Sequence, residues 1–114
     1  MEDDPSALFV VQTNPVPGGE DDYNEWYTNV HIPDILTVPG FVAAQRFRFG
    51  RVQRRPDASY PYSYIALYEI AGDPKEAFAA LDEAVPNFSS SPMLAAERAA
   101  SVFAPITARI RRAT

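Results

Sequence analysis

One junction in the second half of the chain constrains the fold most, because a strand pattern runs directly into a helix start. In residues 62–70 every second side chain shares one face, as in a β-strand. Asp73 is placed to cap a helix, Pro74 suits its first position and Glu76 its third. Pro86 is expected to end this helix, because proline has no backbone N–H to donate. The junction predicts a fold that alternates strands and helices.

Three other segments have strand character. Residues 7–13 form an apolar, β-branched run that predicts a central strand covered on both faces. Residues 41–49 alternate in their second half and predict a strand that pairs with residues 62–70 as an antiparallel hairpin. The run 99–110 predicts a last strand, with Pro105 placing that part at an edge or a bulge. A short helix is expected at residues 93–97.

A further helix is expected between the first two strands, around the only tryptophan and the only histidine, Trp26 and His31. Tyr27 and His31 are four residues apart, so their side chains meet on a helix surface. Pro33 disfavours helical geometry in the residue before it, so the helix is predicted to end near His31. His31 and Asp34 are then expected at the mouth of the helix, where a loop exposes them.

The order strand, helix, strand, strand, helix, strand predicts an α+β fold of the ferredoxin-like βαββαβ type, with a four-stranded antiparallel sheet and both helices on one face. We expect residues 1–114 to form a single domain, with 1–6 as a flexible tail. The uncovered face carries either the tyrosines of 62–68 or Ile65 and Leu67, and both sets are too apolar for water. A homodimer that packs two sheets face to face would bury it, and interface packing is the favoured role of Tyr62 and Tyr68.

Composition excludes several classes of function. The 114 residues contain no cysteine and a single histidine, and the acids have no calcium-loop spacing, so no metal site is expected. The net charge of −5 and the pI of about 4.7 argue against nucleic acid and anionic membranes as partners. No apolar run is long enough to span a bilayer, and no secretion signal is visible. A cytoplasmic location is expected.

The first helix and the segment after it resemble a known group of proteins. The matching residues are Tyr23-Asn24-Glu25-Trp26-Tyr27, His31, Pro33, Asp34, Pro39-Gly40-Phe41 and Arg46-Phe47-Arg48. This pattern resembles the EthD-like branch of the dimeric α/β-barrel superfamily. The resemblance implies a homodimer with a ligand pocket between sheet and helices in each subunit, faced by His31 with Asp34 beside it. The superfamily includes cofactor-free oxygenases, cyclases, isomerases, decarboxylases and haem-binding members, so the fold does not define the activity.

His31, Tyr27 and Asp34 are the catalytic candidates. Histidine titrates near neutral pH and can take or give a proton there. The Asp34 carboxylate would hold the imidazole in one tautomer, and Tyr27 would donate a hydrogen bond to a developing enolate or phenolate oxygen. The alternative is a structural histidine that complements the helix dipole.

The remaining candidates are expected to bind substrate: an arginine would hold a carboxylate, and aromatic side chains would line the pocket. They are Tyr23, Trp26, Arg46, Arg48 and Tyr64. For Trp26, packing on the apolar face of the helix is the alternative.

Together these features predict a cofactor-independent enzyme that acts on a small hydrophobic, aromatic or polyketide-like compound by histidine acid/base chemistry. Cyclisation, isomerisation, decarboxylation and oxygenation all fit, which makes the chain a lyase, cyclase, isomerase or monooxygenase of aromatic compound catabolism. The alternative is a noncatalytic protein of the same fold that binds a small ligand, or haem with His31 as the axial ligand.

Overall fold

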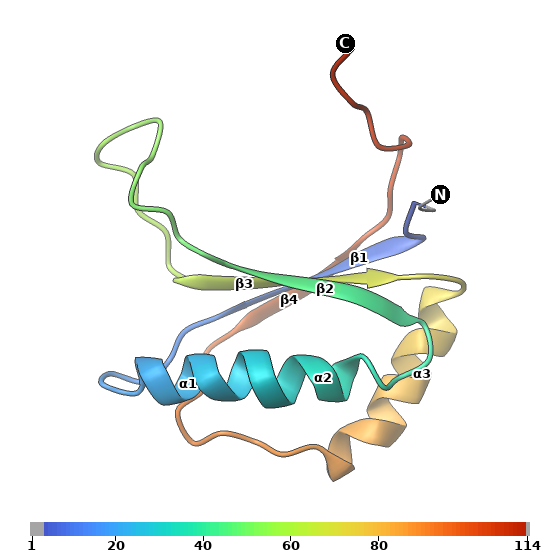
Figure 1. The fold of residues 1–114 in the computed structure, drawn as a ribbon, viewed down its shortest axis with the longest axis horizontal. Helices are drawn as coiled ribbons and strands as arrows, with labels where there is room; N and C mark the ends of the chain where they lie inside the picture. The colour runs from blue at the N-terminus through green and yellow to red at the C-terminus, as the bar shows by residue number, and fades with distance from the viewer. Residues whose placement is uncertain (1–3, 114) are drawn as a thin grey trace.

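The computed structural model describes residues 4–113, in which four antiparallel strands form one sheet with the helices on one of its faces (Figure 1). The strands are β1 (Ala7–Thr13), β2 (Phe41–Arg48), β3 (Tyr64–Ile70) and β4 (Ala99–Phe103), in the order β2-β3-β1-β4. The α-helices are α1 (Glu20–Trp26), α2 (Ile32–Ile35) and α3 (Pro74–Ala84). The predicted ferredoxin-like α+β fold is confirmed, including the β2–β3 hairpin.

Burial alternates along β3 and shows which face of the sheet meets the helices. Tyr64, Ala66, Tyr68 and Ile70 are buried, whereas the residues between them are half-buried. Two tyrosines therefore lie in the core between the sheet and the helices. The expectation that Tyr68 packs in a subunit interface is wrong, because its side chain is only 1% exposed within this chain.

The start of α3 follows the predicted capping pattern. The Asp73 carboxylate accepts a hydrogen bond from the Lys75 backbone N–H at 2.9 Å, and Pro74 is the first helical residue. The helix ends at Ala84 and continues as a short 3₁₀ turn, Val85–Asn87, that contains the expected stop at Pro86.

The first helix does not end near His31 as predicted. A π-helical turn, Tyr27–His31, follows α1 directly, and the Ile32 N–H donates to the Tyr27 carbonyl five residues back. This wider turn accommodates Pro33, which lacks a donor, and the chain stays helical through α2. His31 therefore lies within a continuous helical segment that ends at Ile35, and Asp34 lies in its last turn and not in a loop.

The C-terminal part also differs from the prediction. No helix forms at residues 93–97, because Leu94 pairs with Pro15 and the Ala95 N–H donates to the Asn14 carbonyl. The last strand, β4, is an edge strand paired with β1, and it ends before Pro105. Of the expected flexible tail, residues 1–3 lie outside the described residues.

The face of the sheet that carries no helix is named here the open face. Its apolar side chains come from all four strands and are Leu8, Val10, Phe47, Ile65, Leu67 and Phe103. Two segments without regular structure, residues 49–63 and 104–113, project on this side of the sheet and are named here the two arms (Figure 1). Within the described part of the chain, no helix is both long and apolar enough to cross a bilayer.

Candidate functional site

His31 is enclosed by aromatic side chains of its own helix. Its ring stacks on Trp26 with 4.6 Å between centroids and meets Tyr27 edge-on at 5.0 Å. The predicted contact between Tyr27 and His31 is therefore present. Among the described residues nothing forms a hydrogen bond with the buried Nδ1 of His31. Burying a nitrogen without a hydrogen-bond partner costs free energy. The position of Nδ1 is therefore explained best by a bound ligand that supplies the missing hydrogen bond.

Burial lowers the pKa of His31 below its ordinary value of 6.5, because the imidazolium would lose its solvation. The Asp34 carboxylate acts in the opposite direction but is outweighed, and the positive charges of Arg98 and Arg46 add to the lowering. The imidazole is therefore neutral at pH 7. A neutral imidazole near two cations is suited to accept a proton from a ligand and to leave an anion behind.

Tyr27, which contacts His31, forms a buried pair of phenols with Tyr68. The Tyr68 hydroxyl donates to the Tyr27 oxygen across 3.5 Å, which is a long contact. Burial raises the pKa of both groups, because a phenolate would be poorly solvated there. Both hydroxyls are protonated at neutral pH, so the Tyr27 O–H is a hydrogen-bond donor inside the site.

Arg46 on β2 places a positive charge against three tyrosine rings. The guanidinium carbon lies 4.4 Å from the centroid of the Tyr27 ring and 5.3 Å from those of Tyr23 and Tyr64. Such contacts between a cation and an aromatic face are favourable by about 0.5–2 kcal/mol each. The rings thus fix the guanidinium at the boundary between the sheet and α1.

Two polar residues of the helix complete the position of Arg46. Its Nη1 donates to the Thr28 hydroxyl at 2.8 Å, and its Nη2 donates to the Asn24 side-chain oxygen at 2.9 Å. The Asn24 amide donates in turn to the Tyr64 hydroxyl at 3.1 Å, and this hydroxyl donates to the Glu20 carboxylate. The direct hydrogen-bond acceptors of Arg46 in the described chain are neutral, so its charge is available to an anionic ligand.

Sequence reasoning identified Arg46 but missed both of these partners. Asn24 and Thr28 are four residues apart, so they share one face of a helix. That spacing is the signal that could have revealed them, once the helix was known to lie against β2. Tyr68 was assigned to an interface and is the other residue of the site that was missed.

The predicted site residues fall into two groups. The structure brings together Tyr23, Tyr27, Trp26, His31, Tyr64 and Arg46. Asp34 lies on α2 and influences His31 through its charge, without bonding to the buried Nδ1. Arg48 is exposed at the end of β2, opposite Tyr64 in the strand register.

One surface cavity is an open groove of about 480 Å³ beside the N-terminal end of α1. Pro15, Pro17, Pro61 and Glu20 are among the residues that line it. The groove meets the site at Glu20, the acceptor of the Tyr64 hydroxyl, and it does not border His31. Another cavity, of about 200 Å³, lies between Gly40 and α3. No cluster of three metal-ligating side chains occurs among residues 4–113.

Several solved structures share this fold. The haem-degrader MhuD from Mycobacterium tuberculosis, solved with two haems bound in its active site, is 15% identical with a TM-score of 0.61, covering 90% of this chain and 98% of that one. A Nitrosomonas europaea protein, named for a proposed role as an antibiotic biosynthesis monooxygenase, is 13% identical with a TM-score of 0.54, covering 93% and 96%. An EthD family protein from Bacillus halodurans C-125 is 13% identical with a TM-score of 0.50, covering 88% and 99%.

No family model and no curated protein matches the chain. The structural neighbours share the ferredoxin-like α+β fold of this chain, and one of them is an EthD family protein, the group that the residues around Trp26 and His31 resemble.

Proposed function

We propose that the chain is a cofactor-independent enzyme that removes a proton from a small aromatic or polyketide-like acid. The observation that carries this proposal is the buried, unpartnered Nδ1 of His31 next to the Tyr27 and Arg46 pair. His31 is the base, Tyr27 is a hydrogen-bond donor, and Arg46 supplies a positive charge. This combination suits abstraction of a proton next to a carbonyl group.

The steps follow from the charges of the site. A substrate carboxylate or phenolate pairs with the Arg46 guanidinium, which the three tyrosine rings hold in place. The neutral imidazole of His31 accepts the proton, and the electron pair moves to the carbonyl oxygen. The Tyr27 hydroxyl and the Arg46 charge stabilise the resulting enolate. Cyclisation, isomerisation and decarboxylation can all proceed from such an enolate.

Access to His31 requires a movement near Trp26. The Trp26 indole N–H donates to the Ser89 carbonyl at 3.2 Å, and Ser89 lies in the irregular segment between α3 and β4. Ligand entry would break this hydrogen bond and separate the indole from the Tyr27 and His31 rings that it contacts. Ligand entry is therefore expected to change the fluorescence of the only tryptophan.

The first experiment combines binding and turnover. Aromatic and polyketide-like carboxylic acids are titrated against Trp26 fluorescence, and compounds that bind are assayed for conversion. We expect His31→Ala to lower turnover at least about 100-fold while it leaves binding within about threefold. Lys75→Ala, on the exposed first turn of α3, is the control and should keep both values. Full turnover by His31→Ala would exclude His31 as the base.

The second candidate is a noncatalytic binding protein, which the same neutral His31 and free Arg46 charge would also suit. In that case ligands bind to the wild type without forming a product, and Arg46→Met lowers their affinity. Haem is one possible ligand, because one structural neighbour binds it and a neutral imidazole can ligate iron. Because the Trp26 ring stacks on His31, a haem ligated there would require rearrangement of this pair. A Soret band after haem addition, lost in His31→Ala, would identify this case.

The open face supports a homodimer for either function. Its apolar side chains come from all four strands, and no helix covers them. A second copy related by a two-fold axis would bury the same patch on both subunits. Sedimentation of the purified protein at twice the mass of the 12.6 kDa chain would support this arrangement.

A further inference from the structure

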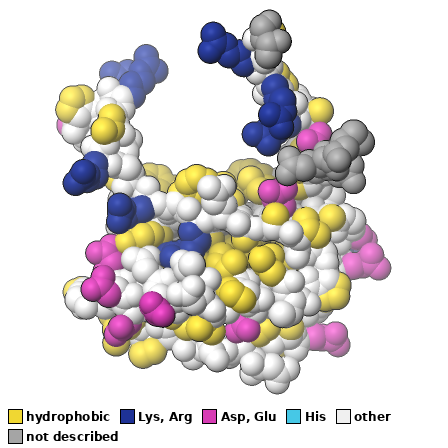
Figure 2. All heavy atoms as spheres, in the orientation of Figure 1, with side chains coloured by type: hydrophobic (Ala, Val, Ile, Leu, Met, Phe, Trp, Pro, Cys, Tyr) yellow, Lys and Arg dark blue, Asp and Glu magenta, His cyan; other side chains and the backbone are white. Residues whose placement is uncertain are grey.

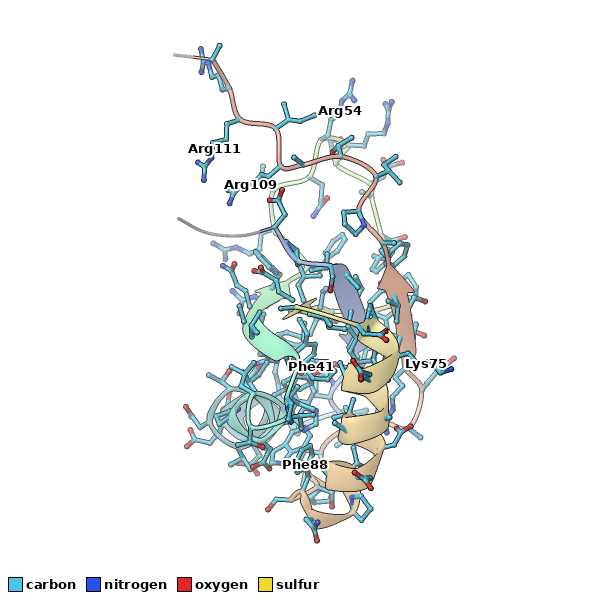
Figure 3. The ribbon with its side chains drawn as sticks, turned by 90° about the vertical axis from the view of Figure 1, so that its right-hand side faces the viewer. Phe41, Arg54, Lys75, Phe88, Arg109 and Arg111 are labelled. Atoms are coloured by element: carbon cyan, nitrogen blue, oxygen red, sulfur yellow. The ribbon has the colours of Figure 1, made fainter. Side chains whose placement is uncertain are left out.

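The two arms expose apolar side chains that no other described residue of the chain covers. Val52 on the first arm is 93% exposed, and Ile106 and Ile110 on the second arm are 97% and 84% exposed. Both arms stand on the same side of the sheet, away from the helices (Figure 3). Exposed apolar residues on segments that flank an open sheet face are typical of an interaction surface.

The first arm is anchored at its base. The Asn14 side chain holds it through the Pro61 carbonyl at 2.8 Å and the Ser63 N–H at 2.7 Å. The Tyr60 hydroxyl donates to the side chain of Gln12 on β1, and the Tyr60 ring stacks with Phe49 at the other side of the base. An arm held in this way is arranged in advance for a partner.

The charge of the chain is divided between the arms and the rest. Six of the ten basic residues lie on the arms, with only one of the fifteen acids, Asp57. The basic residues of the arms are Arg51, Arg54, Arg55, Arg109, Arg111 and Arg112. Figure 2 shows basic side chains on both arms and acidic side chains over the helical layer. The arms are therefore complementary in charge to the body of another copy of the same chain.

Three consecutive acids, Glu20, Asp21 and Asp22, form the first turn of α1. Two sheets packed face to face stand about 10 Å apart, and a helix layer lies about 10 Å further. The first arm is a loop whose outgoing and returning halves have about seven residues each, so its tip lies at most about 23 Å from its base. The arm tips are thus long enough to pass the sheet of a second copy and reach its helices.

We infer that the arms of one copy clasp the body of a second copy, with Arg54 and Arg55 at the acidic first turn of the second copy's α1. This inference rests on the homodimer of the proposed function and adds the contact that holds it. The apolar side chains of the arms cover the sides of the joined sheets, and the arginines pair with carboxylates at the rim. The clasp makes the dimer depend on ionic strength.

Charge reversal in the full-length chain tests the clasp. The dimer dissociation constant is measured by analytical ultracentrifugation at about 50 mM and about 500 mM salt. We expect Arg54→Glu with Arg55→Glu to raise it about tenfold or more at the lower salt, and the high salt to weaken the wild-type dimer. Addition of Asp21→Arg and Asp22→Arg to the same chain should restore the wild-type value within about threefold.

Lys75 provides the matched control, because it lies on α3, on the side of the sheet away from the arms (Figure 3). Lys75→Glu changes the net charge as much as Arg54→Glu alone does, and it should leave the dissociation constant unchanged. Circular dichroism checks that each variant is folded.

Three results would overturn the inference: a monomeric wild type, a dimer indifferent to the arm reversal, or a weakened dimer that the α1 reversal does not rescue. Ligand binding at His31 is followed separately by Trp26 fluorescence. A clasped dimer that binds no ligand would therefore reject the proposed activity and keep the clasp.

Discussion

The guanidinium carbon of Arg46 lies 4.4 Å from the centre of the Tyr27 ring, so that strand β2 and the first helical segment meet through a cation and an aromatic face. The same guanidinium donates two hydrogen bonds to that segment. Arg46 thus connects the sheet to the helical layer through these contacts. It also places a positive charge against Tyr27 in the candidate site.

Replacing Arg46 should cost stability as well as ligand binding. Arg46→Met removes the cation–aromatic contacts and both hydrogen bonds, and we expect the free energy of unfolding to fall by about 2 kcal/mol. Arg48→Met, on the exposed end of the same strand, should change it by less than about 0.5 kcal/mol. Urea unfolding followed by Trp26 fluorescence gives both values. Equal effects of the two substitutions would show that the contacts of Arg46 add nothing.

The lowered pKa of His31 makes stability depend on pH. In the unfolded chain the imidazole takes a proton near pH 6.5, whereas burial disfavours this in the folded chain. Below pH 6.5 the unfolded state binds more protons, so stability is lost as the pH falls from 6.5 towards the folded pKa. Urea unfolding of wild type and His31→Gln at pH 7 and pH 5.5 should show that the variant loses less stability between them. Identical losses would contradict the burial of His31.

Asp34 acts on His31 through its charge, so removing that charge should change the His31 pKa in a predictable direction. The Asp34 carboxylate raises the His31 pKa against the larger effect of burial. Asp34→Asn should therefore lower that pKa further, as measured by NMR titration of the single imidazole. Asp73→Asn, at the cap of α3, keeps a capping side chain and serves as the control with an unchanged His31 pKa. An unchanged pKa in Asp34→Asn would remove Asp34 from the site.

Gly40 is required where β2 begins beside α3. Its φ is +97°, and a Cβ built there would lie 2.7 Å from the Cβ of Ala77. Gly18 has a similar φ of +80° but has nothing within 4 Å of such a Cβ. Gly18→Ala should therefore cost only the backbone strain, about 1 kcal/mol, whereas Gly40→Ala should cost clearly more. Thermal unfolding of the two variants separates the cost of backbone strain from that of the steric clash with Ala77. An equal loss of stability in both would show that α3 moves away from the new methyl group at no cost.

Local signals explain why much of the fold could be predicted. The bounds of β1 agree with the apolar run at residues 7–13, and the Asp73 and Pro74 start of α3 was read from capping chemistry alone. Both depend on side chains that act on their own backbone within a few residues. The pairing of β2 with β3 followed from their order, because two strands joined by a loop of this length form an antiparallel hairpin.

Other features depended on residues that are distant in the sequence. The strand pattern of residues 62–70 has two faces, and only packing against α1 decided that Tyr64 and Tyr68 face the core. Pro33 was expected to stop the helix, but packing keeps Ile35 buried at 5% exposure, which favours a π turn over an early end.

The sequence by itself thus determined the order and kind of the elements, the single histidine and the charge of the arms, because these depend on composition and short-range periodicity. Only the tertiary structure placed Asn24 and Thr28 beside Arg46, and the Tyr68 hydroxyl beside that of Tyr27, because these contacts join residues about twenty to forty positions apart. A chain's local preferences cannot specify such contacts, since they form only when the helix is laid across the sheet in one register.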